Sequence, residues 1–121
     1  NLFPVDDRAP RASIDTAIRA LQTGRIVIWF PEEYRSPDGA LQPFKAGIGR
    51  IVAETGAPVV PCAITGTFAA MPRGARWPRP TATAVRFGAL VPATDLGSEP
   101  GSVAAHLRAH VAALLDEGSR S

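Results

Sequence analysis

The run from Ile26 to Phe30 constrains the fold of this chain most strongly, because all of its residues are apolar and either β-branched or aromatic. Side chains of these two kinds are enriched in strands. Gly24 precedes the run and Pro31 follows it, so residues that commonly end regular structure bound it on both sides. A continuous apolar run of this length predicts a strand buried on both faces, as in a parallel sheet covered by helices.

Periodic apolar residues elsewhere predict helices and further strands around this run. Ser13 is the expected N-cap of a first helix that ends at Gly24, and Ser102 is the expected cap of a last helix that runs to Asp116. The remaining expected elements are a strand end at 2–5, a helix at 45–55, and strands at 59–65 and 81–87. This order predicts a single α/β domain over residues 1–121, layered around a mostly parallel sheet.

The composition excludes several classes of protein. With 45% hydrophobic and 20% charged residues, the 121-residue chain is expected to fold as an ordinary globular domain. Its net charge of +2 does not favour nucleic acid as a partner, and its single cysteine, Cys62, rules out an intrachain disulfide. His106 and His110 have a spacing that a metal ion can use on a helix, but without a third ligand no metal site is expected.

The residues that follow the apolar run carry the clearest chemical signal. They read Phe30-Pro31-Glu32-Glu33-Tyr34-Arg35-Ser36. In open α/β sheets, ligands bind beyond the C-terminal ends of the strands, where this segment would lie. A guanidinium such as that of Arg35 can hold a phosphate through two parallel, charge-assisted hydrogen bonds. The alternative is that Glu32 and Arg35 form an ordinary surface ion pair.

Together with two later motifs, this segment resembles the glycerolipid acyltransferase family, whose third signature is Phe-Pro-Glu-Gly-Thr-Arg-Ser. Lys45-Ala46-Gly47 is similar to the Lys-x-Gly helix start of that family, and Pro58-Val59-Val60-Pro61 to its Val-Pro-Val-x-Pro-Val strand. Phe3, Val5 and Arg8 partly match the second signature. The resemblance covers slightly more than the first half of the chain and implies a layered fold like that of glycerol-phosphate acyltransferases.

The resemblance implies an acyltransferase of phospholipid biosynthesis, which transfers a fatty acyl group to a lysophospholipid such as lysophosphatidic acid (1-acylglycerol-3-phosphate). The donor would be a thioester, acyl-CoA or acyl carrier protein, and no other cofactor is expected. The implied acceptor-phosphate site comprises Arg8, Phe30, Pro31, Glu32, Arg35 and Ser36. The implied acyl-donor side comprises Pro58, Val59, Val60 and Pro61.

The catalytic motif of that family, His-x-x-x-x-Asp, does not occur in this sequence. Its histidine serves as general base on the acceptor hydroxyl, and its aspartate orients the histidine. The fifth residue after His106 is Val111, and the fifth after His110 is Leu115. We therefore expect a fragment, the C-terminal part of an acyltransferase domain truncated at its N-terminus, which has no catalytic residue and no activity alone. Its sheet would expose an edge and an apolar face, so marginal stability or self-association is also expected.

Two residues of the third signature depart from the family pattern. Glu33 stands where the family has glycine, and Tyr34 stands where it has threonine. Glycine lets the backbone come close to a phosphate, whereas a glutamate adds bulk and a like charge near the anion. Either the Glu33 side chain points to solvent or acceptor binding is altered, and the sequence leaves both open.

The segment from Phe68 to Arg79 mixes apolar and aromatic side chains with arginines, as at a membrane interface where arginines meet anionic lipid. The residues concerned are Phe68, Met71, Arg73, Arg76, Trp77 and Arg79. Because acyltransferases of this kind must reach lipid acceptors, we expect a peripheral, membrane-associated protein at the cytoplasmic face. The alternative is an ordinary loop packed on the core.

Two other functions are compatible with the sequence. The first is a non-catalytic module that binds a phospholipid headgroup as part of a larger enzyme. The second is a generic α/β interaction domain whose arginines are solvated surface residues. A His-x-x-x-x-Asp motif shortly before Asn1 would favour the enzyme, and headgroup binding that survives Arg35→Ala would favour the generic domain.

Overall fold

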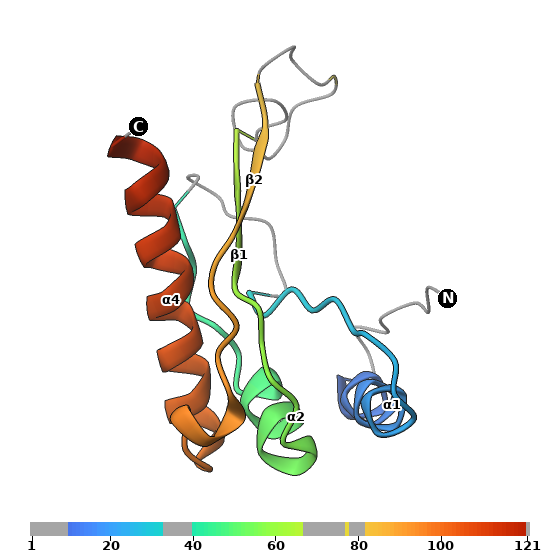
Figure 1. The fold of residues 1–121 in the computed structure, drawn as a ribbon. Helices are drawn as coiled ribbons and strands as arrows, with labels where there is room; N and C mark the ends of the chain where they lie inside the picture. The colour runs from blue at the N-terminus through green and yellow to red at the C-terminus, as the bar shows by residue number, and fades with distance from the viewer. Residues whose placement is uncertain (1–9, 33–39, 67–76, 78–81, 121) are drawn as a thin grey trace.

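The computed structural model describes residues 10–32, 40–66, 77 and 82–120. In these residues the helices are α1 (Pro10–Gln22), α2 (Gly47–Thr55) and α4 (Pro100–Arg120), and the strands are β1 (Cys62–Thr65) and β2 (Ala84–Phe87). A short 3-10 helix, η1 (Ala93–Asp95), precedes α4. Helix α2 packs against both α1 and α4, and α4 runs alongside β1 and β2 (Figure 1).

The helices begin at residues other than those the sequence predicts. Helix α4 starts at Pro100, and the Glu99 carboxylate accepts hydrogen bonds from the backbone N–H groups of Gly101 (3.1 Å) and Ser102 (2.6 Å). The prediction that Ser102 is the cap is therefore wrong, because Glu99 satisfies these free N–H groups instead. Ser13 lies buried inside α1, which begins at Pro10, and α2 begins at Gly47.

The predicted ends of the first two helices are confirmed. Gly24 has a φ of 82°, and its neighbour Arg25 donates its backbone N–H to Ala20 O at 3.0 Å. Gly56 has a φ of 66° and donates its N–H to Val52 O at 2.8 Å. Both glycines adopt the left-handed conformation that favours glycine at a helix end.

The sheet is antiparallel within the described residues, so the prediction of a mostly parallel sheet is wrong for this part of the chain. Strand β1 pairs with β2 in a register that places Cys62 opposite Phe87 and Thr65 opposite Ala84. A further antiparallel bridge joins Val59 to Val91. The expected strands 59–65 and 81–87 are thus present in shorter form, as β1 and β2.

The run from Ile26 to Phe30, predicted to be a buried strand, is extended but has no strand partner among the described residues. Val27 and Trp29 pack against the apolar side of α1. The alternate side chains are exposed, by 94% at Ile26, 78% at Ile28 and 68% at Phe30. The prediction fails because burial on the second face requires a neighbouring element, which the described residues do not supply.

The core consists of two clusters on either side of α2. One contains Ala17, Ile18 and Ile51 between α1 and α2. The other lies between α2, η1 and α4 and contains Val52, Val91, Leu96, Val103 and Leu107. Gly49 allows the close contact of α2 with the start of α4, because an added Cβ would lie 1.9 Å from Pro100 O.

Candidate functional site

Two hydrogen bonds join the end of the apolar run to the segment that leads into α2. The backbone N–H of Lys45 donates to Pro31 O at 2.8 Å. The backbone N–H of Gln42 donates to Oε2 of Glu32, also at 2.8 Å. Glu32 therefore accepts a hydrogen bond from a backbone N–H group of the segment that follows residues 33–39 in the sequence. The chain positions on either side of residues 33–39 are held together by these bonds.

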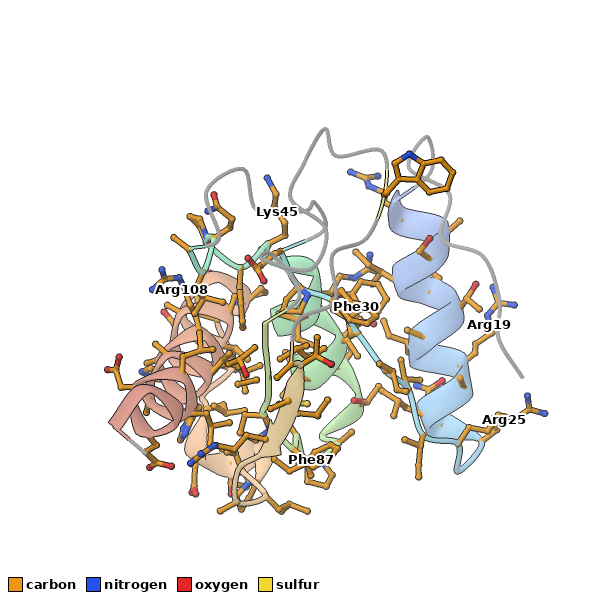
Figure 2. The ribbon with its side chains drawn as sticks, turned by 90° about the horizontal axis from the view of Figure 1, so that it is seen from above. Arg19, Arg25, Phe30, Lys45, Phe87 and Arg108 are labelled. Atoms are coloured by element: carbon orange, nitrogen blue, oxygen red, sulfur yellow. The ribbon has the colours of Figure 1, made fainter. Side chains whose placement is uncertain are left out.

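Helix α4 adds a third attachment to the same segment. The guanidinium of Arg108 donates from Nη2 to Leu41 O at 2.8 Å and from Nε to Gln42 O at 3.2 Å. Figure 2 shows Arg108 on the side of α4 next to the segment that carries Lys45. Sequence reasoning missed Arg108, because the contact spans 66 residues and no local pattern indicates it.

The structure places part of the expected acceptor site. Phe30, Pro31 and Glu32 are described, with the Phe30 side chain exposed and the other two half-buried. Arg8, Arg35 and Ser36 lie outside the described residues, as do Glu33 and Tyr34. Their proximity to Glu32 therefore stays a prediction.

The expected acyl-donor side, Pro58 to Pro61, is joined by backbone hydrogen bonds to the chain that follows β2. Val59 exchanges two backbone hydrogen bonds with Val91, at 2.9 and 2.7 Å, and Pro61 O accepts the N–H of Gly88 at 2.8 Å. Pro61 is buried, whereas Pro58 and Val60 are exposed. The geometry fixes the backbone of this stretch, and its contact with an acyl donor stays a prediction.

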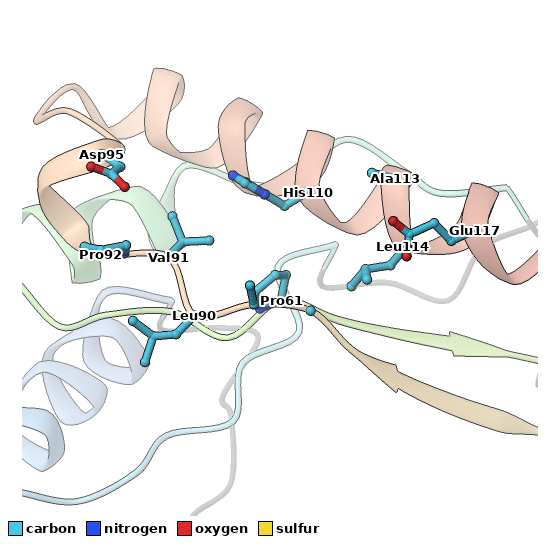
Figure 3. Close-up of a pocket in the computed structure, with 11 residues that line it drawn as sticks. Pro61, Leu90, Val91, Pro92, Asp95, His110, Ala113, Leu114 and Glu117 are labelled. Carbon is cyan, nitrogen blue, oxygen red and sulfur yellow. The ribbon is translucent and has the colours of Figure 1, made fainter.

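A shallow groove of about 440 Å³ lies between α4 and the chain that joins β2 to η1 (Figure 3). Pro61, Leu90 and Leu114 give it an apolar wall, while its polar groups are those of Asp95, His110 and Glu117. Among the expected site residues that the structure describes, Pro61 contributes to its lining and Phe30 to Glu32 do not. The described part of the signature segment therefore does not line this groove.

His106 and His110, which have the i, i+4 spacing considered for a metal ion, are both exposed on α4. A second groove of about 380 Å³ is lined by both histidines together with Asp95. Among the described residues, no three or more His, Cys, Asp or Glu side chains are grouped so that they could hold a metal ion.

Of the residues expected at a membrane interface, Trp77 alone lies within the described residues, where its side chain is 81% exposed. The other five, Phe68, Met71, Arg73, Arg76 and Arg79, lie outside them. Within the described part of the chain, no helix combines the length and apolar character that a bilayer crossing requires.

The Phe-Pro-Glu segment and the helix that follows it, α2, both lie in the part of the chain that matches a known protein family. The family described as Acyltransferase matches residues 2–65. This chain therefore belongs to the acyltransferase family.

Relatives and a solved structure support the same assignment. The chain is 43% identical over 76 residues to the 1-acyl-sn-glycerol-3-phosphate acyltransferase BAT2 of Brassica napus, covering 60% of this chain and 22% of that protein. It is 34% identical over 87 residues to the 1-acyl-sn-glycerol-3-phosphate acyltransferase of Limnanthes alba, covering 69% of this chain and 31% of that protein.

The crystal structure of the 1-acyl-sn-glycerophosphate acyltransferase PlsC from Thermotoga maritima is similar in fold. The TM-score is 0.83 and the sequence identity 32%, over 94% of this chain and 46% of that one. The α/β fold expected from the sequence is thus confirmed at the level of this likeness. The chain spans less than half the length of each of these three proteins.

Proposed function

We propose that this chain supplies the acceptor-phosphate site of a 1-acylglycerol-3-phosphate acyltransferase. The observation that carries the proposal is the attachment of the signature segment, in which Glu32 and Pro31 bind the backbone of Gln42 and Lys45. The names of the relatives that match this region give 1-acyl-sn-glycerol-3-phosphate as the acyl acceptor. We further propose that residues 1–121 form one domain, the C-terminal part of the complete acyltransferase domain.

Arg35 is the proposed phosphate ligand, with Arg8 and Ser36 as further donors. A guanidinium suits this task because its planar fork matches two phosphate oxygens and keeps its charge at any physiological pH. Oε2 of Glu32 accepts a hydrogen bond from the backbone N–H of Gln42. We therefore propose that Glu32 positions the segment that carries Arg35 and does not contact the phosphate. Phe30 and Pro31 would border the acceptor beside it.

The chemical step needs a general base that the sequence of residues 1–121 does not supply in the family's pattern, since neither histidine is followed by aspartate at the fifth position. We propose that a His-x-x-x-x-Asp segment outside this sequence takes the proton of the acceptor hydroxyl. The acyl thioester, as CoA or carrier protein, would lie beside Pro58 to Pro61. This chain alone is then expected to leave lysophosphatidic acid unacylated, and transfer by the purified chain would contradict this.

We also propose that the protein acts at the cytoplasmic face of a membrane as a peripheral protein. The exposed indole of Trp77 supports this placement, because aromatic side chains favour the headgroup region. Co-sedimentation with vesicles that contain anionic lipid tests it, and absence of binding to both anionic and neutral vesicles would refute it.

Titration calorimetry with a short-chain lysophosphatidic acid tests the acceptor site. Arg35→Ala should weaken binding about tenfold or more, because the loss of one hydrogen bond to a charged group costs about 1.5–3 kcal/mol. Arg19→Ala is the matched control, since Arg19 is an exposed arginine of α1, and it should bind like the parent chain. Equal affinity of the Arg35→Ala and Arg19→Ala variants would refute the proposal.

A second candidate function is a non-catalytic module that binds phospholipid headgroups within a larger enzyme. Both functions predict binding of lysophosphatidic acid by this chain. They differ in the full-length protein, where acyl transfer identifies the enzyme and headgroup binding without transfer identifies the module.

A further inference from the structure

One peptide group beside the signature segment is bound at both of its ends by charged side chains. The N–H of the Leu41–Gln42 peptide donates a hydrogen bond to Oε2 of Glu32 at 2.8 Å. The carbonyl oxygen of the same peptide belongs to Leu41 and accepts a hydrogen bond from Nη2 of Arg108 at 2.8 Å. The carboxylate thus lies at the positive end of the peptide dipole and the guanidinium at its negative end. Hydrogen bonds in such a chain polarise and strengthen one another.

Arg108 also contacts the next peptide, because its Nε donates to Gln42 O at 3.2 Å. Two successive carbonyl groups are therefore held by a single planar guanidinium. Bonds from an ionised donor are roughly twice as strong as neutral ones, and the fixed fork restricts the angle between the two carbonyls. A lysine at this position would offer a single nitrogen and could not reproduce that arrangement.

The rigid element behind this contact is helix α4. Arg108 follows Leu107, which is 3% exposed and packs in the core with Val52 of α2. The guanidinium is therefore carried by a helix that is anchored in the larger core cluster. Both bonded peptides are half-buried, which shields these hydrogen bonds from competition by water.

We infer that Arg108 is a positioning residue for acceptor binding, which acts through the Leu41–Gln42 peptide and Glu32 on the segment that carries Arg35. The inference rests on the proposed function, because Arg35 lies three residues after Glu32 and six before Leu41 in the sequence. Arg108 itself need not touch the acceptor. Its effect is to fix the positions of Glu32 and the Leu41–Gln42 peptide, which flank residues 33–40 in the sequence.

The test measures two quantities on the same 121-residue chain: the hydrogen-exchange rate of the Gln42 amide by NMR and the affinity for a short-chain lysophosphatidic acid by calorimetry. Arg108→Ala should raise the exchange rate about tenfold and raise the Kd about tenfold. Arg108→Lys should raise the exchange rate and the Kd by less than Arg108→Ala does, since lysine keeps one donor nitrogen. Arg19→Ala, which removes a positive charge from an exposed position of α1, should change neither the exchange rate nor the affinity.

A double substitution separates positioning from general destabilisation. If Arg108 acts through the shared peptide, adding Arg108→Ala to Glu32→Gln should weaken acceptor binding by much less than the product of the two single effects. Full multiplication of the effects would overturn the inference. Faster exchange at Gln42 with unchanged affinity would also overturn it, since Arg108 would then be structural only.

Failure of the proposed function would give a different set of results. In that case the parent chain and all variants would show no measurable binding of lysophosphatidic acid, while the Gln42 amide would still exchange faster in the Arg108→Ala variant. Unchanged exchange at Gln42 in that variant, with parent-like acceptor binding, would instead refute the contact itself and leave the proposed function standing.

Discussion

The two faces of the β1–β2 pair differ in how they are covered. On one face, Ala63 is 2% exposed beneath α4, and Leu114 of α4 lies against Gly88 and Pro61. On the other face, the paired positions Ile64 and Val85 and the neighbouring Phe87 are exposed. The uncovered face is the more apolar of the two, because Thr65 and Arg86 lie on the same face as Ala63. Among the described residues, coverage therefore follows the position of α4 and not the character of the strands.

The run from Ile26 to Phe30 shows the same contrast. Its inward side chains, Val27 and Trp29, join the α1 cluster, while Ile28 and its outward neighbours are exposed. Among the described residues, the buried indole Nε1 of Trp29 also has no hydrogen-bond partner. In both the β1–β2 pair and this run, one face is therefore buried and the other is exposed, although the exposed face is apolar.

The largest expected effect is a loss of stability on truncating a side chain of the core between α2 and α4. Leu107→Ala removes a fully enclosed side chain between α2 and α4 and should lower the free energy of unfolding by about 2–5 kcal/mol. Ile26→Ala, at an exposed site, should stay within about 0.5 kcal/mol of the parent chain. Urea unfolding followed by circular dichroism measures both. Equal losses at the two sites would show that the exposed run is buried in solution.

Gly49→Ala should have the next largest effect. The added Cβ would clash with Pro100 O at 1.9 Å, so α2 and α4 must move apart, at a cost of about 1–3 kcal/mol. Gly118→Ala is the matched control near the other end of α4, where the nearest atoms, in the Arg86 side chain, are 3.8 Å or more away. That control should be neutral or stabilising, because alanine favours the helix over glycine.

Charge on the uncovered side should change association rather than stability. We expect the chain to self-associate through its exposed apolar residues, and Ile28→Lys or Phe87→Lys to weaken that association about tenfold. Sedimentation equilibrium measures the change. Thr94→Lys adds the same charge at an exposed polar site and should have no effect. A monomeric parent chain would show instead that these faces do not attract one another.

The smallest expected effect is a pH dependence at the start of α4. Hydrogen bonds from the backbone N–H groups of Ser102 and Gly101 lower the pKa of Glu99 from its ordinary value of 4.5. A lowered pKa means that the stabilisation is complete above pH 4.5 and is lost as the pH falls through the folded-state value. The difference in urea midpoint between the parent chain and Glu99→Gln should therefore shrink from pH 7 to pH 3. A constant difference would contradict the assignment.

The helices could be predicted from the sequence because their signals are local, whereas the site role of the signature segment stays a prediction. The spacing of Ile14, Ala17 and Ile18 gives a helix face, and Gly24 and Gly56 end helices for a conformational reason that needs no tertiary context. Helix starts were less predictable, since serine is a favoured N-cap and glutamate is not, yet the geometry lets Glu99 accept the free N–H groups.

Features that depend on distant partners could not be predicted. The run at Ile28 has the composition of a buried strand, but its burial depends on a neighbour that no local pattern specifies. The antiparallel direction of β1 and β2 likewise depends on the path of the chain between them. Arg108 reaches Leu41 across 67 residues, and an arginine beside a buried leucine on a helix is too common to indicate such a contact.

The close contact at Gly49 also limits how sequences of this kind can vary. Main-chain atoms set the distance between α2 and the start of α4, so no choice of side chain at position 49 can compensate for a change on the facing helix. Variation is expected instead at the partly buried positions around the same cluster, such as Phe44, Ile48 and Ala93, where one side chain can grow as another shrinks. Redesign of this core should begin at those three positions and retain the glycine.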